Sequence, residues 1–396
     1  MSIPETTNLQ QPAKVPFWRD PVKRGHIFQA VVLLIALSVG YILFANTQAN
    51  LERQSIATGF GFIEREAGFE IAEPPIAYSA ADTYGRALLV GALNTLKVSF
   101  VGIIFSLILG TIVGISRLSH NWLVAKLSGA FIEVMQNIPV LLQLFFWYAL
   151  FYEAFPSPRQ ALHPLPGMFL CNRGLIFAVP AAHPAHKWML LAALVGVIGW
   201  YLLTRWGHRV QDATGKIMPV HRMGMGLTLI LPLLVWAFAG APTALDIPVL
   251  RGFNFRGGMT VSPEFSALLI GLILYTSAFV AEIVRAGIQA VSKGQIEAAM
   301  SIGLKPGQVL RLVVLPQALR VIIPPVTSQM LNLTKNSSLA IAIGYADFVS
   351  VANTTINQTG QAIEGVALIM LVYLIFSLST SLFMNWYNKK MALVER

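Results

Sequence analysis

Eight long apolar runs divide this chain, and each is close to the length that an α-helix needs to cross a membrane. The hydrocarbon core is about 30 Å thick, so a crossing helix needs about 20 apolar residues. The runs lie at residues 27–45, 88–115, 127–151, 188–203, 225–240, 265–284, 325–345 and 363–383. The fourth and fifth are the shortest, since about 16 helical residues reach only about 24 Å. The sequence predicts an all-α polytopic membrane protein with about eight transmembrane helices.

Few charged residues are available to coat the surface of a soluble globule. Lys, Arg, Asp and Glu make up 12% of the chain, whereas about a quarter is usual for soluble proteins. The sequence contains a single cysteine, Cys171, which excludes a disulfide or a thiolate metal site within one chain. The histidines lack ligand spacing, and neither an H-E-x-x-H motif nor a nucleophile elbow occurs. We therefore expect no catalytic residue, no metal site and no cofactor site on this chain.

The basic residues are distributed unevenly between the segments that join the runs. With the N-terminus in the cytoplasm, 18 of the 28 Lys and Arg residues fall in cytoplasmic segments and 8 in outer loops. Because basic residues in short loops are retained on the cytoplasmic side, this distribution favours cytoplasmic N- and C-termini. It also accounts for most of the net charge of +10 without a nucleic-acid partner.

A charged, glycine-containing segment separates the sixth run from the seventh, on the cytoplasmic side in this topology. It contains a motif with the spacing E-A-A-x3-G-x11-L-P, formed by Glu297, Ala298, Ala299, Gly303, Leu315 and Pro316. The two alanines keep one helical face flat enough for another protein to approach, and Gly303 can take positive φ and end the helix. Residues 305–307 turn the chain, and residues 308–319 offer a second amphipathic helix. The segment therefore predicts a short helix-turn-helix that docks in the cleft of a partner.

This spacing resembles the cytoplasmic loop with which the permeases of ABC importers hold their ATPase subunits. Further motifs look like the polar amino-acid branch of these permeases, and the length and extra spans are most similar to its general L-amino-acid permease subgroup. These motifs are Gly91-x-x-Asn94-Thr95-Leu96, Phe131-Ile132-Glu133-Val134, Ile138-Pro139-Val140 and Leu333-x-Lys335-Asn336-Ser337-Ser338-Leu339. The resemblance covers residues 84–152 and 261–388. It implies that the second, third, sixth, seventh and eighth runs form the core of a type I ABC-importer permease.

The resemblance also implies a division of the chain into five parts. Residues 1–26 form a cytoplasmic tail, 27–87 an additional first span with a periplasmic loop, and 88–152 the first part of the permease core. Residues 153–260 are an insertion with periplasmic loops and two additional spans, and 261–396 complete the core with an ATPase-docking loop at 286–320. The residues that the resemblance assigns to ATPase coupling are Glu297, Ala298, Ala299, Gly303, Leu304, Lys305, Arg311 and Pro316.

The family's function would make this chain the permease subunit of an ATP-driven, binding-protein-dependent importer of polar L-amino acids in the bacterial inner membrane. The implied partners are two copies of an ABC ATPase, a periplasmic amino-acid-binding protein, membrane lipid and a second permease. That permease is either another copy or, as the subgroup favours, a different homologue. The sequence has no G-x4-G-K-[ST] phosphate loop, so ATP and Mg²⁺ would be bound by the separate ATPase.

Two other classes of membrane protein would share this composition. An ion- or proton-coupled secondary amino-acid transporter usually shows internal repeats and intramembrane acids, whereas this chain shows no evident repeat and few acids within the runs. Such a transporter also needs no cytoplasmic docking helix. An intramembrane enzyme is disfavoured because the catalytic motifs are missing. The ATP-driven importer is therefore the preferred hypothesis, with the secondary transporter as the alternative.

Polar residues within the runs are candidates for a substrate path, because a charge that faces lipid at the bilayer centre costs about 2.5 kcal/mol or more. On the third run they recur at helical spacing and would share one face: Glu133, Gln136, Asn137 and Gln143. The seventh run carries a second stripe: Asn332, Lys335, Asn336, Ser337 and Ser338. Together the stripes contain donors for a carboxylate and acceptors for an ammonium group. For the amides and hydroxyls, hydrogen bonding between helices is the structural alternative.

Lys335 is the charged residue of the second stripe. If the seventh helix starts near Pro325, Lys335 lies about 15 Å along it, close to the middle of the membrane. A lysine there needs a carboxylate, carbonyl groups or water, or else it loses its proton. Glu133 and Glu282 are candidate partners within the chain, and the carboxylate of a passing substrate is the functional alternative.

Overall fold

The structure is a computed structural model and describes residues 21–53, 58–216 and 218–391. Within these ranges, seven helices are long and apolar enough to cross a membrane, and a bent pair of shorter helices gives an eighth candidate span. The α-helices are α1 (Pro21–Arg53), α2 (Tyr84–Ser116), α3 (Trp122–Asn137), α4 (Val140–Ala149), α5 (Pro184–Thr214), α6 (Val220–Phe238), α7 (Pro263–Gln289), α8 (Lys293–Ser301), α9 (Pro306–Val309), α10 (Leu315–Asn336), α11 (Phe348–Thr359) and α12 (Ala362–Met391). The prediction of a helical membrane protein with about eight spans is confirmed.

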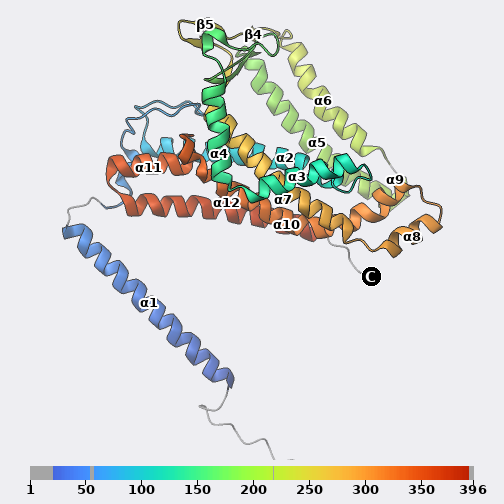
Figure 1. The fold of residues 1–396 in the computed structure, drawn as a ribbon, viewed down its shortest axis with the longest axis horizontal. Coiled ribbons are helices and arrows are strands. Elements are labelled where there is room, and N and C mark those ends of the chain that lie inside the picture. The colour runs from blue at the N-terminus through green and yellow to red at the C-terminus, as the bar shows by residue number, and fades with distance from the viewer. Residues whose placement is uncertain (1–20, 54–57, 217, 392–396) are drawn as a thin grey trace, which may run out of the picture.

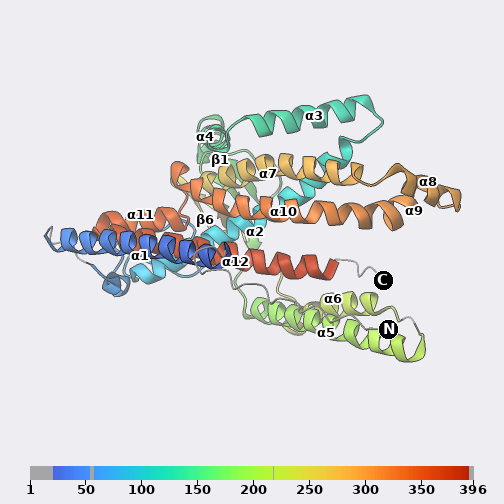
Figure 2. The same ribbon diagram turned by 90° about the horizontal axis from the view of Figure 1, so that it is seen from below.

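Helices α2, α7 and α10 pack at the centre of the bundle, and α12 runs beside α10 along the same axis (Figures 1 and 2). Small residues at four-residue spacing on α2 allow its backbone to approach α7 closely, as in many membrane helix pairs. A Cβ at Gly110 would lie 2.6 Å from the Cβ of Val280, and one at Gly114 would lie 2.6 Å from the carbonyl oxygen of Ala281. Backbone contact between α2 and α7 therefore depends on the missing side chains of these glycines.

The third apolar run, predicted as a span at 127–151, is not one continuous helix but a pair of helices with a sharp bend between them. Helix α3 ends at Asn137, α4 begins at Val140, and their axes differ by 102°. Pro139 gives the physical reason, since it has no backbone N–H and forces Ile138 out of the helical region, to φ −95° and ψ 126°. The Gln143 amide then donates to the carbonyl oxygens of Met135 and Ile138, both at 2.9 Å, and stabilises the end of α3. A π-helical turn, Leu150–Ala154, continues α4.

The insertion at 153–260 contributes a helical hairpin formed by α5 and α6. These helices pack closely on each other, because a Cβ at Gly196 of α5 would lie only 2.7 Å from the Cα of Thr228 of α6. Both apolar runs predicted here, at 188–203 and 225–240, belong to helices that begin at least four residues earlier. Helix α5 is extended by 11 residues after its run, which supplies the length that the run lacked.

Short strands lie beside this hairpin. The all-α prediction did not include these strands. They are β1 (Met168–Cys171), β2 (Gly174–Phe177), β3 (Val179–Pro180), β4 (Leu245–Asp246), β5 (Val249–Arg251), β6 (Asn254–Arg256) and β7 (Met259–Val261). An antiparallel sheet has the order β1-β2-β7, with Cys171 opposite Gly174 and Leu175 opposite Val261. The pairs β3-β4 and β5-β6 are also antiparallel. Strand β7 leads directly into α7, so the sheet lies at the start of that helix.

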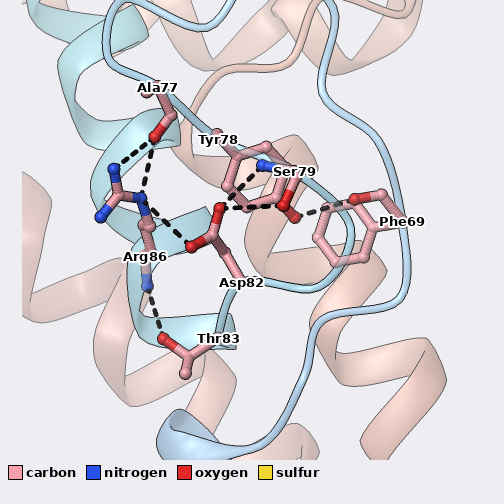
Figure 3. Close-up of polar contacts among 7 residues, drawn as sticks. All are labelled: Phe69, Ala77, Tyr78, Ser79, Asp82, Thr83 and Arg86. Atoms are coloured by element: carbon pink, nitrogen blue, oxygen red, sulfur yellow. Dashed lines mark hydrogen bonds and ion pairs between the residues drawn. The ribbon is translucent and has the colours of Figure 1, made fainter.

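Residues 58–83, which precede α2, fold against the bundle. An apolar cluster anchors them through Phe62, Ala67, Ile71, Tyr84 and Phe348. Figure 3 shows the polar contacts of this segment: the Arg86 guanidinium donates to the carbonyl oxygen of Ala77 and pairs with Asp82 at 3.6 Å. Thr83 Oγ1 accepts a hydrogen bond from the Arg86 N–H at 3.3 Å and begins α2. This outer segment is therefore held on α2 and α11.

The seventh apolar run is the outer part of a longer helix, so the predicted helix start near residue 325 is wrong. Pro306 opens α9, a π-helical turn at Leu310–Val314 follows, and α10 continues the same helical path to a 3₁₀ turn at Ser337–Ile343. Pro316 explains the π turn, because its missing N–H removes one bond of the α-helical ladder just before it. The separate amphipathic helix predicted at 308–319 is accordingly continuous with the membrane helix, and the connection between α7 and that long helix is shorter than the docking loop predicted at 286–320.

Candidate coupling loop and polar residues of the bundle

Helix α8 joins α7 to the long helix of α9 and α10, and it ends in a Schellman turn. Gly303 has φ +85°. The Leu304 N–H donates to the Ala299 carbonyl at 3.3 Å, and the Gly303 N–H donates to the Met300 carbonyl at 2.9 Å. This pattern requires a left-handed residue at position 303, which glycine adopts without steric cost. The prediction that Gly303 takes positive φ and ends the helix is confirmed.

Ala298 and Ala299 do not share one exposed face, which corrects the prediction of a flat docking surface made by both. Ala299 is 5% exposed and packs in an apolar cluster with Val309 and Val314. Ala298 is exposed, since neighbours on a helix point about 100° apart. The exposed side of α8 and its turn also carries large apolar side chains, because Met300 is 50% and Ile302 78% exposed. Exposed apolar side chains that cluster in this way mark an interaction surface.

The other residues assigned to coupling surround this turn. Glu297, Lys305, Arg311 and Pro316 are exposed, and Leu304 is half-buried against the cluster that contains Ala299. The Lys305 N–H donates to Gln308 Oε1 at 2.9 Å and opens α9. Both α8 and α9 lie at one end of the bundle, opposite α11 (Figures 1 and 2).

The structure separates the four polar residues of the third run. Glu133, Gln136 and Asn137 lie on α3, whereas Gln143 lies on α4 beyond the 102° bend. The four residues therefore do not share one helical face. The Gln136 amide donates to the Ala278 carbonyl of α7 at 3.2 Å, and the Asn137 amide donates to the Glu133 carbonyl at 2.7 Å. Gln136 thus links two helices, and the Glu133 side chain is exposed.

The polar residues of the seventh run lie near the C-terminal end of α10. Asn332 and Lys335 are exposed one turn apart, and Asn336 ends the helix. The Ser337 hydroxyl donates to the Thr334 carbonyl and the Ser338 hydroxyl to the Lys335 carbonyl, both at 2.7 Å. These hydroxyls therefore satisfy the helix end locally.

Lys335 is not at the middle of its helix, as the predicted helix start implied. The continuous helix runs from Pro306 to Ile343, so Lys335 lies closer to its C-terminal end than to its start. Within α10, Lys335 is one residue before the last. Among the described residues, no carboxylate lies within ion-pair distance of its ammonium group. Glu282, one of the expected partners, instead pairs with Arg285 one turn further along α7. Glu133 is not brought to Lys335 either, and both side chains are exposed in the isolated chain.

Three buried polar residues hold α11 on α2. From the sequence alone, no role was assigned to them. The Asn94 amide donates to the Ala346 carbonyl at 2.9 Å, and Thr95 Oγ1 accepts from the Phe348 N–H at 3.0 Å. Between these two contacts lies Asp347, which caps the start of α11. We call Asn94, Thr95 and Asp347 the polar clamp. The only sequence signal for it was the Asn-Thr pair inside an otherwise apolar run.

The Asp347 carboxylate is fully buried. It accepts hydrogen bonds from the Ser350 N–H at 2.9 Å and from the Tyr373 hydroxyl at 3.3 Å. Burial raises the pKa of Asp347 to about 7, although the backbone N–H groups of Ser350 and Val349 favour its charged form. Gly91 makes room for the clamp, because a Cβ there would lie 3.1 Å from the Asp347 carbonyl oxygen.

A second carboxylate, Glu73, connects the outer segment to α2 and α7. Its backbone is left-handed, with φ +53°. Its Oε1 accepts from the Ser262 N–H at 2.5 Å, and its Oε2 lies 4.0 Å from Lys97 Nζ. That ammonium also lies 4.4 Å from the centre of the Phe265 ring. Burial raises the pKa of Glu73 above its ordinary value, and the nearby Lys97 opposes this shift.

Comparisons with known proteins agree with this architecture. Residues 217–393 match the family described as the binding-protein-dependent transport system inner membrane component. The general L-amino acid transport system permease protein AapQ of Rhizobium johnstonii is 50% identical over 381 residues, which cover 95% of this chain and 94% of that protein. The putative amino-acid ABC transporter permease protein YhdX of Escherichia coli is 49% identical, with coverage of 95% and 96%.

A third relative is the glutamate/glutamine/aspartate/asparagine transport system permease protein BztB of Rhodobacter capsulatus. It is 42% identical over 405 residues, which cover 94% of this chain and 95% of that protein. The similarity to all three relatives extends over nearly the whole length, and therefore over the insertion as well as the core. On this evidence the chain belongs to the family of membrane permease subunits of amino-acid ABC transporters.

Proposed function

We propose that this chain is the permease subunit of an ATP-driven, binding-protein-dependent importer of polar L-amino acids. It would work with two copies of a separate ABC ATPase, a periplasmic amino-acid-binding protein and a second, homologous permease subunit. ATP and Mg²⁺ would be bound by the ATPase. The observation that carries this proposal is the Schellman turn of α8, which exposes Met300 and Ile302 while Ala299 packs inward. Family membership gives no support to the alternative of an ion- or proton-coupled transporter.

The packing of α8 provides a route by which movement of an ATPase would reach the membrane helices. Ala299 belongs to one apolar cluster with Val284 of α7, Val314 and Ala318. Val314 lies directly before α10, and Ala318 lies in its first turn. Closely packed side chains transmit displacement rather than absorb it. A shift of α8 would therefore move α7 and α10 together, and these two helices contribute to the centre of the bundle.

The exposed polar residues of the membrane helices support the presence of a second permease subunit. Glu133, Asn332 and Lys335 are exposed in the isolated chain, although they lie on apolar helices. Exposure of such groups to lipid is unfavourable, so another polar surface must face them. A second permease would supply that surface, and an amino-acid path between the two subunits would be lined by these side chains. The names of the relatives indicate general or acidic and amide L-amino acids as the substrates of those proteins.

Gly303→Asp tests the coupling assignment. The substitution puts a charge on the exposed turn and places a side chain on a left-handed backbone, at a conformational cost of about 1 kcal/mol. We expect the variant to insert in the membrane but to lose at least nine-tenths of ATPase co-purification and of amino-acid uptake.

Gly215→Asp is the matched control, because Gly215 ends α5 with φ +71° and, like Gly303, has open space around its Cβ position. Both substitutions add the same charge to the same backbone conformation. Gly215→Asp should therefore keep ATPase association and uptake. If Gly303→Asp behaves like this control, α8 is not the coupling element.

A further inference from the structure

A polar pocket lies where the insertion meets the start of α7, at the ends of the membrane-spanning helices. Its volume is about 390 Å³. The polar residues that border it are Tyr152, Asn172, Arg173, Asn254, Thr260, Ser262 and Glu264. In the proposed topology it is on the periplasmic side, because the start of α7 is opposite the end that leads to α8. Pockets of about 300 Å³ or more hold small molecules, so this one is large enough for an amino acid.

The walls of the pocket are fixed by the surrounding structure. In the turn between β1 and β2, the Asn172 N–H donates to the Pro156 carbonyl at 2.8 Å. Gly174 follows with φ +107°, and a Cβ there would overlap the carbonyl oxygen of Val261 on β7. On the opposite wall, Ser262 Oγ accepts from the Phe265 N–H at 3.1 Å and caps α7. A pocket that is preorganised in this way needs little rearrangement to bind a ligand.

The polar groups in the pocket have unused hydrogen-bonding capacity. Arg173 is exposed, and no carboxylate of the described residues forms an ion pair with its guanidinium. Asn172 Oδ1 is buried without a hydrogen-bond partner in the described part of the chain. Within the described ranges, the Glu264 carboxylate accepts a single, long hydrogen bond, at 3.5 Å, from the Tyr148 hydroxyl. The site thus offers one cation, Arg173, and one anion, Glu264.

We propose that this pocket binds a free L-α-amino acid with an uncharged polar side chain. Arg173 would hold the α-carboxylate, since a guanidinium pairs with a carboxylate through two parallel hydrogen bonds. Glu264 would accept from the α-ammonium group. One cation and one anion match a zwitterion better than a molecule with net charge. The inference rests on the proposed importer function and adds a site distinct from the polar residues of the membrane helices.

The test is a titration of the purified complete transporter, without its binding protein, with L-glutamine in a calorimeter. We expect saturable binding by the wild type and at least a tenfold weaker affinity in Arg173→Gln, because a charged hydrogen-bonded pair contributes that much or more. L-Glutaminamide lacks the carboxylate and should bind at least tenfold more weakly than L-glutamine to the wild type. In Arg173→Gln this discrimination should disappear. N-acetyl-L-glutamine, which lacks the ammonium group, should likewise bind more weakly to the wild type.

Arg65→Gln is the control, because Arg65 is an exposed arginine of the outer segment that does not border the pocket. Its affinity should stay within twofold of the wild type. Absence of saturable binding by the wild type, or equal affinity in Arg173→Gln and Arg65→Gln, would overturn the inference. Uptake by the wild type in proteoliposomes with the binding protein is measured in parallel. Uptake without binding at this pocket would refute the site and leave the importer function standing.

Discussion

Asp347→Asn should stabilise the protein at neutral pH, and about half of this gain should be lost at pH 5. The carboxylate is fully buried in the polar clamp and, among the described residues, has no basic side chain as an ion-pair partner. Burial therefore raises its pKa from 3.8 to about 7. An asparagine at this position keeps an acceptor for the Ser350 N–H and caps α11 equally well, but it cannot ionise.

The sign and size of the effect follow from proton linkage. Between pH 3.8 and about 7 the unfolded chain has lost the proton of Asp347 while the folded protein retains it. The folded state then binds more protons, so stability falls as the pH rises through this window and stays low above it. A shift of about three pKa units corresponds to about 4 kcal/mol at pH 8, and to about 2 kcal/mol at pH 5. The advantage of Asp347→Asn should therefore grow by about 2 kcal/mol between these pH values.

Thermal unfolding of the detergent-purified protein at pH 5 and pH 8 measures this difference, with tryptophan fluorescence as the signal. Asp212→Asn provides a control of the same chemistry, because Asp212 is exposed near the end of α5. That control should change stability equally at both pH values. An Asp347→Asn variant that is less stable than the wild type at pH 8, or whose advantage does not depend on pH, would refute the linkage argument.

Three further predictions test the packing, the polar path and the topology. Gly110→Val should destabilise the protein by about 3 kcal/mol, because its Cβ would lie 2.6 Å from that of Val280, whereas Gly40→Val on the exposed α1 should have little effect on the melting temperature. Lys335→Met should preserve ATPase association and raise the half-saturating amino-acid concentration for uptake at least threefold; failure to assemble would instead make Lys335 structural. A reporter active only in the periplasm should be active in the 58–83 segment and silent at the C-terminus, and the reverse pattern would exclude cytoplasmic termini.

Several features of this protein could be predicted because they depend on short stretches of chain. The length of an apolar run and its mean polarity decide whether a helix can cross a membrane, so the positions of the spans followed without tertiary information. The left-handed Gly303 was likewise predictable, since a glycine after an alanine-rich helical segment ends a helix by local backbone geometry alone. The motif around Glu297 singled out the segment that we propose for coupling, although its inward and outward faces were not assigned.

Other features were decided only when distant segments met. Strand β2 pairs with β7, about 85 residues later, and each strand is too short to be recognised by its own pattern. The depth of Lys335 depended on whether the helix restarts after the docking turn or continues from it. Asp347 lies about 250 residues from the neighbouring Asn94 and Thr95, and all three are ordinary polar residues until burial makes their hydrogen bonds necessary. Local sequence thus determined which segments are helical, whereas tertiary packing decided which polar groups are satisfied, because a hydrogen bond depends on a partner that only the fold brings near.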